Sequence, residues 1–347
     1  MKTEIVKITD AGRSSDVFRR AGEIIRGGGL VVFPTETVYG LGADATNPAA
    51  AEKIYRAKGR PSDNPLIMHI ADPHDAEKYT YTNGLYYKLA ESFMPGPLTV
   101  IMEARQTVPE EVRASLPTVA VRCPSSEIAH ALISASGVPI AAPSANLSGT
   151  PSPTCARHVI DDMDGRVDMI IDGGDCDIGV ESTIVQITGE DSMLLLRPGR
   201  ITPDELSSFG RLDIAAAVTS ELKEGEKPLS PGMKYKHYAP KTEFVLLDGS
   251  REARLKFLAG NSSNTAVICD YCDKAEISSL IPESNIFVWG RSDNSAEHAH
   301  NLFRILRDAD KLGFDRIYAP MPDTDGVGLA LYNRMLRASA HKIIKLD

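Results

Sequence analysis

Short apolar runs alternate with amphipathic stretches along the first two thirds of the chain. The apolar runs predict β-strands, and the stretches with helical periodicity predict α-helices. Strands are predicted at 30–33, 66–70, 97–102, 118–123, 138–142, 168–172, 182–188 and 192–196, and helices at 14–27, 85–93, 125–136 and 154–163. This alternation is typical of an α/β domain with a large mixed sheet.

One more helix is delimited by its capping residues. Asn47 is a typical N-cap, and Pro48 occupies the first helical position. Gly59 and Pro61 end the helix, because glycine favours the turn after a helix and proline cannot continue it. The helix therefore leads into a loop that carries the polar string R-A-K-G-R-P-S-D-N-P-L, residues 56–66.

The alternation restarts in the last third of the chain. Strands are predicted at 243–248, 265–269, 285–289, 315–319 and 342–346, and helices at 250–259, 273–280, 295–312 and 327–338. Five strands with intervening helices predict a small Rossmann-like three-layer α/β/α domain with a parallel sheet. No G-x-G-x-x-G string follows its first strand, and Gly326 and Gly328 come only after the fourth, which argues against an oxidoreductase.

The segment that joins the two alternating regions has no periodicity and is rich in Lys, Gly and Pro, which predicts a linker. We therefore expect a first domain at 1–210, a linker at 211–242 and a second domain at 243–347. Tyr235, His237 and Tyr238 are unusual in a spacer. Their presence raises the hypothesis that the linker contacts a ligand.

Composition agrees with a soluble globular protein of two domains. The chain has 347 residues, 42% hydrophobic and 24% charged. It contains no run of 18 apolar residues, and its first residues do not resemble a signal peptide, so we expect a cytoplasmic protein with no membrane partner. Five cysteines fit a reducing compartment. Cys269 and Cys272 form a C-x-x-C, but no second cysteine pair or nearby histidines complete a zinc site, and we interpret them as structural.

Two polar strings indicate a phosphate ligand. In the first, Lys58 and Arg60 are two fixed cations at a helix end. The second, A-P-S-A-N at 142–146, places small hydrogen-bonding groups directly after a buried strand. The net charge of −9 argues against a general nucleic-acid-binding surface. Residues 53–60 nevertheless carry four basic side chains and no acidic one, which leaves room for a local basic cleft.

Taken together, the motifs resemble the YrdC family in its longer, two-domain form. The matching strings, in family order, are F-P-T-E-T-V-Y-G-L (33–41), A-K-G-R-P-S-D-N-P-L (57–66), M-P-G-P-L-T (94–99), T-V-A-V-R (118–122), A-P-S-A-N (142–146), G-V-E-S-T-I (179–184), L-R-P-G (196–199) and S-P-G-M-K-Y-K-H-Y-A-P (230–240). The resemblance implies a twisted mixed sheet of the YrdC type, followed by the linker and the small second domain.

The resemblance also implies a reaction. L-threonine, bicarbonate or CO2 and ATP would give threonylcarbamoyl-AMP and pyrophosphate, for modification of a tRNA adenosine beside the anticodon. Further implied partners are a downstream tRNA-threonylcarbamoyl transferase complex and tRNA. Mg²⁺ is expected to accompany ATP, without dedicated protein ligands.

Matching the family motifs residue by residue implies two groups of site residues. The catalytic set is Lys58, Arg60, Ser144 and Asn146. ATP binding is assigned to these four with Asn64, Thr118, Ser152, Arg197 and Tyr235, and L-threonine binding to Thr35, Thr37, His69, Arg122 and Ser182. The linker would cap the site through Tyr235 and exclude water.

Several of these residues also have a purely structural interpretation. Lys58 could complement the helix dipole, and Asn64 could form a turn before Pro65. His69 could be a satisfied core residue and Arg197 a surface ion pair. The linker tyrosines could simply attach the linker to the first domain.

The resemblance also leaves two other functions to consider within the same family. A double-stranded RNA-binding module without catalysis would require a basic concave face, which the net charge does not favour. Carbamoyl transfer to another acceptor occurs in larger hydrogenase-maturation proteins. Those proteins need zinc-finger-like and acylphosphatase-like segments that this sequence lacks.

Overall fold

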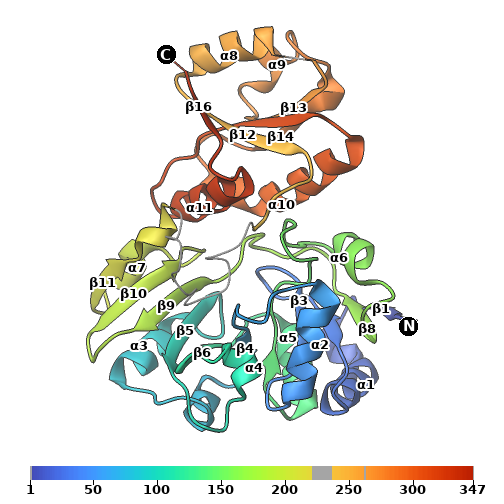
Figure 1. Ribbon diagram of the computed structural model, residues 1–347, viewed down its shortest axis with the longest axis vertical. Helices are drawn as coiled ribbons and strands as arrows, with labels where there is room; N and C mark the ends of the chain where they lie inside the picture. The colour runs from blue at the N-terminus through green and yellow to red at the C-terminus, as the bar shows by residue number, and fades with distance from the viewer. Residues whose placement is uncertain (1, 221–236, 262, 347) are drawn as a thin grey trace. The chain divides into compact units, whose positions relative to one another are not determined.

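The computed structural model describes residues 2–220, 237–261 and 263–346 (Figure 1). These residues form two compact units. The first comprises residues 2–148 and 152–220, and the second comprises residues 149–151 and 237–346 except 262. Each unit contains one sheet.

The sheet of the first unit has eleven strands in the order β1-β8-β2-β3-β7-β4-β6-β5-β9-β10-β11. The strands are β1 (Glu4–Lys7), β2 (Val31–Phe33), β3 (Gly40–Asp44), β4 (Ile67–His69), β5 (Leu98–Glu103), β6 (Thr118–Arg122), β7 (Ile140–Ala141), β8 (Met169–Asp172), β9 (Thr183–Ile187), β10 (Ser192–Arg197) and β11 (Arg211–Ile214). Parallel pairs such as β4–β6 and antiparallel pairs such as β5–β6 both occur, so the predicted mixed sheet is confirmed.

The helices of this unit are α1 (Ser15–Arg26), α2 (Pro48–Lys58), α3 (Gly84–Phe93), α4 (Glu110–Arg113), α5 (Glu127–Ser136), α6 (Ala156–Met163) and α7 (Pro203–Ser207), with 3-10 turns at Ala11–Arg13, Pro73–Lys78 and Ala216–Val218. Helix α2 begins as predicted, because the Asn47 side chain accepts hydrogen bonds from the N–H groups of Ala49 and Ala50.

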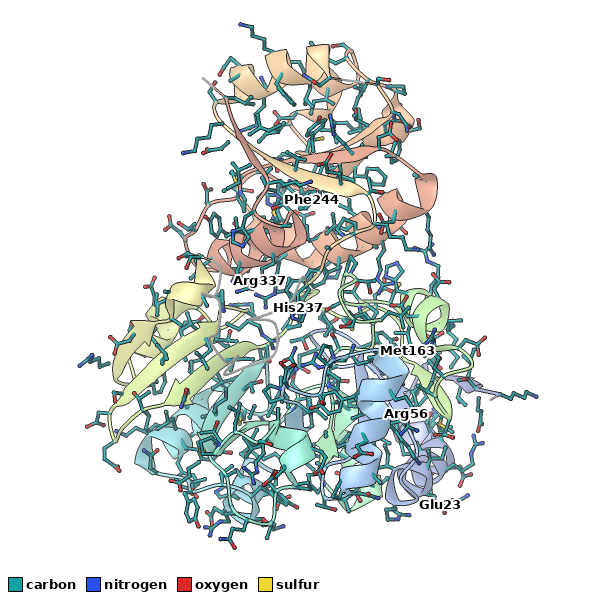
Figure 2. The ribbon with its side chains drawn as sticks, in the orientation of Figure 1. Glu23, Arg56, Met163, His237, Phe244 and Arg337 are labelled. Carbon is teal, nitrogen blue, oxygen red and sulfur yellow. The ribbon has the colours of Figure 1, made fainter. Side chains whose placement is uncertain are left out.

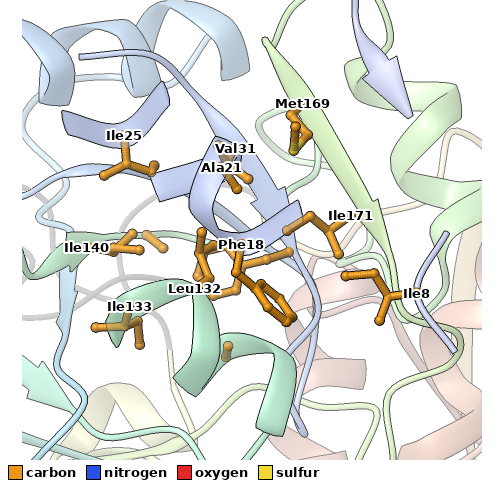
Figure 3. Packing of buried hydrophobic residues seen from close by; sticks show 13 residues of the cluster. Ile8, Phe18, Ala21, Ile25, Val31, Leu132, Ile133, Ile140, Met169 and Ile171 are labelled. Carbon is orange, nitrogen blue, oxygen red and sulfur yellow. The ribbon is translucent and has the colours of Figure 1, made fainter. Parts of the chain in front are cut away.

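Helices α1 and α5 pack against each other and cover part of the sheet (Figures 1 and 3). Apolar residues spaced three or four apart on each helix face this contact. The buried cluster includes Phe18, Ala21 and Ile25 from α1, Leu132 and Ile133 from α5, and Val31, Ile140, Met169 and Ile171 from the strands beneath (Figure 3). Burial of this apolar surface is what the helical periodicity predicted.

The second unit has five parallel strands in the order β14-β13-β15-β12-β16. They are β12 (Glu243–Asp248), β13 (Thr265–Asp270), β14 (Ile286–Gly290), β15 (Arg316–Pro320) and β16 (Ile343–Lys345). The helices are α8 (Arg251–Gly260), α9 (Lys274–Ile277), α10 (Ser295–Leu312) and α11 (Gly328–Ala338), with a 3-10 turn at Glu283–Asn285. Helices α8 and α9 lie on one face of the sheet and α10 and α11 on the other, which confirms the three-layer prediction (Figure 1).

The structure contains elements that the hydrophobic pattern did not predict, namely β1, β3, β11, α4 and α7. Strand β11 lies within the range assigned to the linker, so that range was wrong at its start: residues 211–214 pair in parallel with β10. Strand β3 was missed because G-L-G-A-D reads as a turn. Gly42 has to be glycine, since a Cβ there would lie 2.7 Å from Ile140 Cγ2.

None of the helices that the structure describes is long and apolar enough to cross a membrane.

The α1–α5 cluster gives a stability prediction. Phe18 is 4% exposed and sits at the centre of the cluster, so Phe18→Ala should lower the free energy of unfolding by about 3–5 kcal/mol. Urea denaturation measures the change. The control is Ile5→Ala, because Ile5 is 45% exposed. This substitution should lower the free energy of unfolding by less than about 1 kcal/mol. Equal losses for the two variants would contradict the assignment of the core.

Candidate active site

The chain between β2 and β3, residues 34–39, is buried yet forms no strand; we call it the central segment. A buried loop must find partners for its backbone groups. Here those partners come from three other loops. Each of these loops contains one of the motif strings or lies next to one in the sequence. The bonds are Ile178 N to Glu36 O (2.8 Å), Gly179 N to Thr37 O (3.1 Å), Tyr39 N to Pro153 O (3.0 Å) and Ala145 N to Tyr39 O (2.8 Å). The central segment therefore holds the motif loops together.

Lys58 links the two strings that indicated a phosphate ligand. It is the last residue of α2, is 2% exposed, and its Nζ donates to the backbone carbonyls of Ser144 and Asn146. The backbone N–H of Ser148 bonds back to the Lys58 carbonyl at 2.9 Å. Gly59 follows with φ 61°, a left-handed conformation that glycine adopts without strain. A lysine that merely complemented the helix dipole would not reach these carbonyls.

The predicted basic cluster at 53–60 divides into two parts. Lys53 and Arg56 are exposed on α2, where Figure 2 labels Arg56. Arg60 is half-buried, and its Nη2 donates to the carbonyls of Asn64 (3.3 Å) and Pro65 (3.1 Å). Asn64 is 1% exposed, and its Oδ1 is buried without a hydrogen-bond partner among the described residues. An orphan acceptor of this kind is unusual and marks a candidate ligand contact.

The S-x-N residues bond to each other. The Ser144 hydroxyl donates to Asn146 Oδ1 at 2.5 Å, and the Asn146 amide donates to the Leu147 carbonyl at 2.8 Å. Ser152 is fully buried, and its hydroxyl donates to the Glu181 carboxylate. The serine hydroxyls thus have fixed orientations in the ligand-free protein.

Arg197 is buried rather than paired on the surface, so the surface ion-pair interpretation is wrong. Its Nε and Nη2 donate to the carbonyl and hydroxyl of Ser182 at 3.0 and 3.1 Å. The Ser182 hydroxyl also shares a 2.7 Å hydrogen bond with Thr99. The backbone at residue 199 passes close to the backbone of Thr183. This close approach requires Gly199, because a Cβ there would lie 2.4 Å from the backbone nitrogen of Thr183.

His69 and Arg122 lie side by side in register on the parallel strands β4 and β6. Arg122 is 4% exposed, and its Nη2 donates to Glu36 Oε1 at 2.6 Å, while its Nε donates to the Gly96 carbonyl at 3.4 Å. His69 is 3% exposed, with Nδ1 3.1 Å from the Ile67 carbonyl. A carbonyl only accepts, so a protonated Nδ1 would donate to it and leave Nε2 as an acceptor.

Electrostatics keep these side chains in defined charge states. Burial, reinforced by the Arg122 charge, lowers the pKa of His69 to about 3, so its imidazole is neutral at physiological pH. Burial raises the pKa of Glu36, but the Arg122 charge and hydrogen bond, with two backbone N–H groups, outweigh it and hold that pKa below its usual range. The ion pair of Arg122 and Glu36 is thus buried beside a neutral histidine.

The predicted threonines differ in their surroundings. Thr35 and Thr37 share a 2.8 Å hydroxyl–hydroxyl hydrogen bond inside the central segment, and Thr35 also donates to the Val38 carbonyl at 2.7 Å. Thr118 is half-buried at the start of β6, four residues before Arg122, so it lies at the opposite end of that strand. Its assignment to the nucleotide stays a prediction.

Tyr235 lies outside the described residues. Its neighbour Tyr238 belongs to the second unit, where it stacks on Phe303 with ring centroids 5.2 Å apart and lies under Arg334. Sequence reasoning missed Glu36, Glu181 and Thr99. Glu36 and Glu181 were visible as carboxylates inside otherwise small and apolar motif strings, and that contrast is the signal that could have found them.

Metal ligands do not gather in this site. Within the described parts of the chain, one cluster has three potential ligands close enough to share an ion. It consists of Asp270, Cys272 and Asp273 in the second unit. Asp273 is paired there with Arg251 at 2.5 Å, and Asp270 accepts from the Trp289 indole at 2.7 Å. These carboxylates already have partners, which agrees with a structural role for the C-x-x-C.

The neutral His69 gives a prediction on pH. An unfolded histidine takes up a proton near pH 6.5, whereas folded His69 stays neutral down to about pH 3. Its contribution to stability is therefore complete above pH 6.5 and is lost as the pH falls toward 3, at up to about 1.4 kcal/mol per pH unit. His69→Gln should flatten the pH dependence of the unfolding free energy between pH 6.5 and 4, measured by urea denaturation.

His74→Gln is the control, because His74 is exposed. The prediction fails if the His69 variant keeps the slope of the unmodified protein.

Comparison with known proteins identifies the family of the chain. A family described as "Telomere recombination" (Sua5/YciO/YrdC) matches residues 23–199, and a second, described as "Threonylcarbamoyl-AMP synthase, C-terminal domain", matches residues 201–340. A threonylcarbamoyl-AMP synthase of Pyrococcus abyssi is 41% identical over 345 residues, covering 94% of this chain and 95% of the relative. One of Bacillus subtilis is 42% identical over 352 residues, covering 99% and 100%.

Solved structures show the same two-domain fold. The crystal structure of Pyrococcus abyssi Sua5 complexed with L-threonine superposes with a TM-score of 0.88 at 40% identity, covering all of both chains. The similarity therefore extends over the full length of both chains. The chain belongs to the Sua5/YciO/YrdC family, in the two-domain form that carries the threonylcarbamoyl-AMP synthase C-terminal domain.

Proposed function

We propose that this chain is an L-threonylcarbamoyladenylate synthase, which converts L-threonine, bicarbonate or CO2, and ATP into threonylcarbamoyl-AMP and pyrophosphate. The observation that carries the proposal is the central segment, residues 34–39. It hydrogen-bonds to the loop of Ser144 and Asn146 and to the loop of Ser182, and it pairs with Arg122. Groups suited to a triphosphate and groups suited to an amino acid are thus fixed to one support. The names of the full-length relatives support the same activity.

The nucleotide half uses fixed cations and small polar groups. Lys58 and Arg60 would neutralise the triphosphate, with Ser144 and Asn146 donating to its oxygens. Asn64, Thr118, Ser152, Arg197 and Tyr235 complete this set in the proposal. Arg197 also contacts Ser182, which we assign to threonine, so it lies where the two halves meet.

The threonine half rests on Arg122. Its guanidinium would bind the substrate carboxylate, and the neutral His69 would accept a hydrogen bond from the substrate through Nε2. Thr35, Thr37 and Ser182 supply hydroxyl groups around the same position. The complex of the Pyrococcus abyssi relative with L-threonine supports this choice of amino acid.

The chemistry follows in two steps. The threonine amine, as the free base, adds to CO2 and loses a proton to give a carbamate. A carbamate oxygen then attacks the α-phosphorus of ATP, the bond to the β-phosphate oxygen breaks, and pyrophosphate leaves with the electron pair. Negative charge grows on the transferring and leaving groups, which is where Lys58, Arg60 and Arg197 would act. The carbamate decomposes in open water, so its enclosure would protect it.

Mg²⁺ is expected to enter with ATP, held by phosphate oxygens and water, and to supply further positive charge to the phosphates. The product would pass to a tRNA-threonylcarbamoyl transferase complex that acts on tRNA.

The first test measures pyrophosphate release by the purified protein. With ATP, L-threonine and bicarbonate together, we expect release, and a product with the mass of threonylcarbamoyl-AMP. Omission of threonine or bicarbonate should abolish both signals. Pyrophosphate release that continues without threonine or without bicarbonate would refute the proposal. Binding of double-stranded RNA without any pyrophosphate release would support the non-catalytic alternative.

The second test separates the two parts of the basic cluster. Arg60→Ala should lower the rate of pyrophosphate release by about 100-fold or more, because a fixed cation near the phosphates is lost. Arg56→Ala is the matched control, since Arg56 is an exposed arginine on the preceding helix, and its rate should be unchanged. Equal rates for the two folded variants would assign Arg60 a structural role.

A further inference from the structure

Arg122 is held from two sides before any substrate arrives. Its Nε bonds to the Gly96 carbonyl at 3.4 Å and its Nη2 bonds to Glu36 Oε1 at 2.6 Å. Its Nη1 makes no hydrogen bond to a described residue. A planar guanidinium fixed at two nitrogens has one orientation, and the remaining nitrogen is the one available to a ligand.

Glu36 is the stronger of these two supports. It is 7% exposed, and its Oε1 lies in a short, charge-assisted contact, whereas the contact to Gly96 is long for a hydrogen bond. Removal of the acceptor leaves the buried Nη2–H donor of Arg122 without a partner, which is strongly unfavourable. Without Glu36 the Arg122 side chain would therefore turn toward solvent or another acceptor.

The position of Glu36 in the chain makes this support rigid. It lies in the central segment, where its own carbonyl accepts from Ile178 N and the next carbonyl accepts from Gly179 N. Its backbone therefore cannot shift without breaking bonds to the loop of Ser182. The orientation of Arg122 on β6 is thus tied to a segment that also positions the other predicted threonine contacts.

We propose that Glu36 is a positioning residue for amino-acid binding, which sets the direction of the Arg122 guanidinium so that Nη1 meets the carboxylate of L-threonine. This inference rests on the proposed function. Glu36 acts through Arg122 and need not touch the substrate. Glu36 contributes by fixing the orientation of the Arg122 guanidinium, and its negative charge is not required. The position of Oε1 needs only an atom that accepts a hydrogen bond from Nη2.

The test compares three substitutions by isothermal titration calorimetry with L-threonine and, separately, with ATP. Glu36→Ala removes the acceptor and should weaken threonine binding by about 10- to 100-fold, while ATP affinity changes little. Glu36→Gln keeps a neutral acceptor at the same place and should restore most of the threonine affinity. Glu36→Asp keeps the charge but shortens the side chain, and should bind threonine more weakly than Glu36→Gln.

Asp44→Ala is the matched control. Asp44 is a carboxylate of the same unit, 8% exposed, that accepts from the hydroxyl of Thr46 and has no arginine partner among the described residues. Its loss should lower the melting temperature without changing threonine affinity.

The outcomes distinguish this inference from the proposed function. If the unmodified protein binds no threonine, the proposed function fails. If it binds threonine and folded Glu36→Ala or Glu36→Asp binds it equally well, only the positioning role fails. The role also fails if Glu36→Gln is as weak as Glu36→Ala, or if threonine and ATP affinities fall together. Should Glu36→Ala not fold, the Gln and Asp variants decide.

Discussion

The backbone hydrogen bonds of residues 34–39 are the constraint on which the rest of the first unit depends. Burial without a strand means that the amides and carbonyls of this segment need hydrogen-bonding partners. The Thr35 hydroxyl supplies some of them from within the segment, and the others come from the loops around residues 145, 153 and 178–179. Those loops contain the polar motifs or lie next to them. The hydrogen bonds that pair the backbone of the buried segment therefore also fix the relative positions of the side chains that we assign to ligands.

Buried cations are the second common feature of the site. Lys58 bonds to backbone carbonyls, Arg197 to a carbonyl and a hydroxyl, and Arg122 to a carbonyl and a carboxylate. These three cations are buried in the first unit although the chain carries a net charge of −9. A site of this kind attracts anions, and its polar groups are oriented before a ligand binds.

The two units illustrate different uses of an α/β sheet. The second unit follows its sequence pattern closely, with helices on both faces of a parallel sheet, and its polar groups pair with one another, as Asp270 does with Trp289. The first unit instead interrupts its sheet with buried loops and glycines in close contacts, such as Gly42 and Gly199. Departures from regular patterning concentrate where the chemistry is proposed, as expected for a functional site.

The sequence by itself determined the α/β class, the five-strand second sheet, and most strand and helix positions to within two residues, because apolar periodicity is a local property. Motif order also indicated the family and its site residues. Only the tertiary structure decided that β3 and β11 are strands, that Arg56 is exposed while Arg60 is half-buried, and that His69 Nδ1 lies beside the Ile67 carbonyl. It alone revealed the pair of Glu36 and Arg122, 86 residues apart, because such contacts depend on which loops the buried backbone brings together.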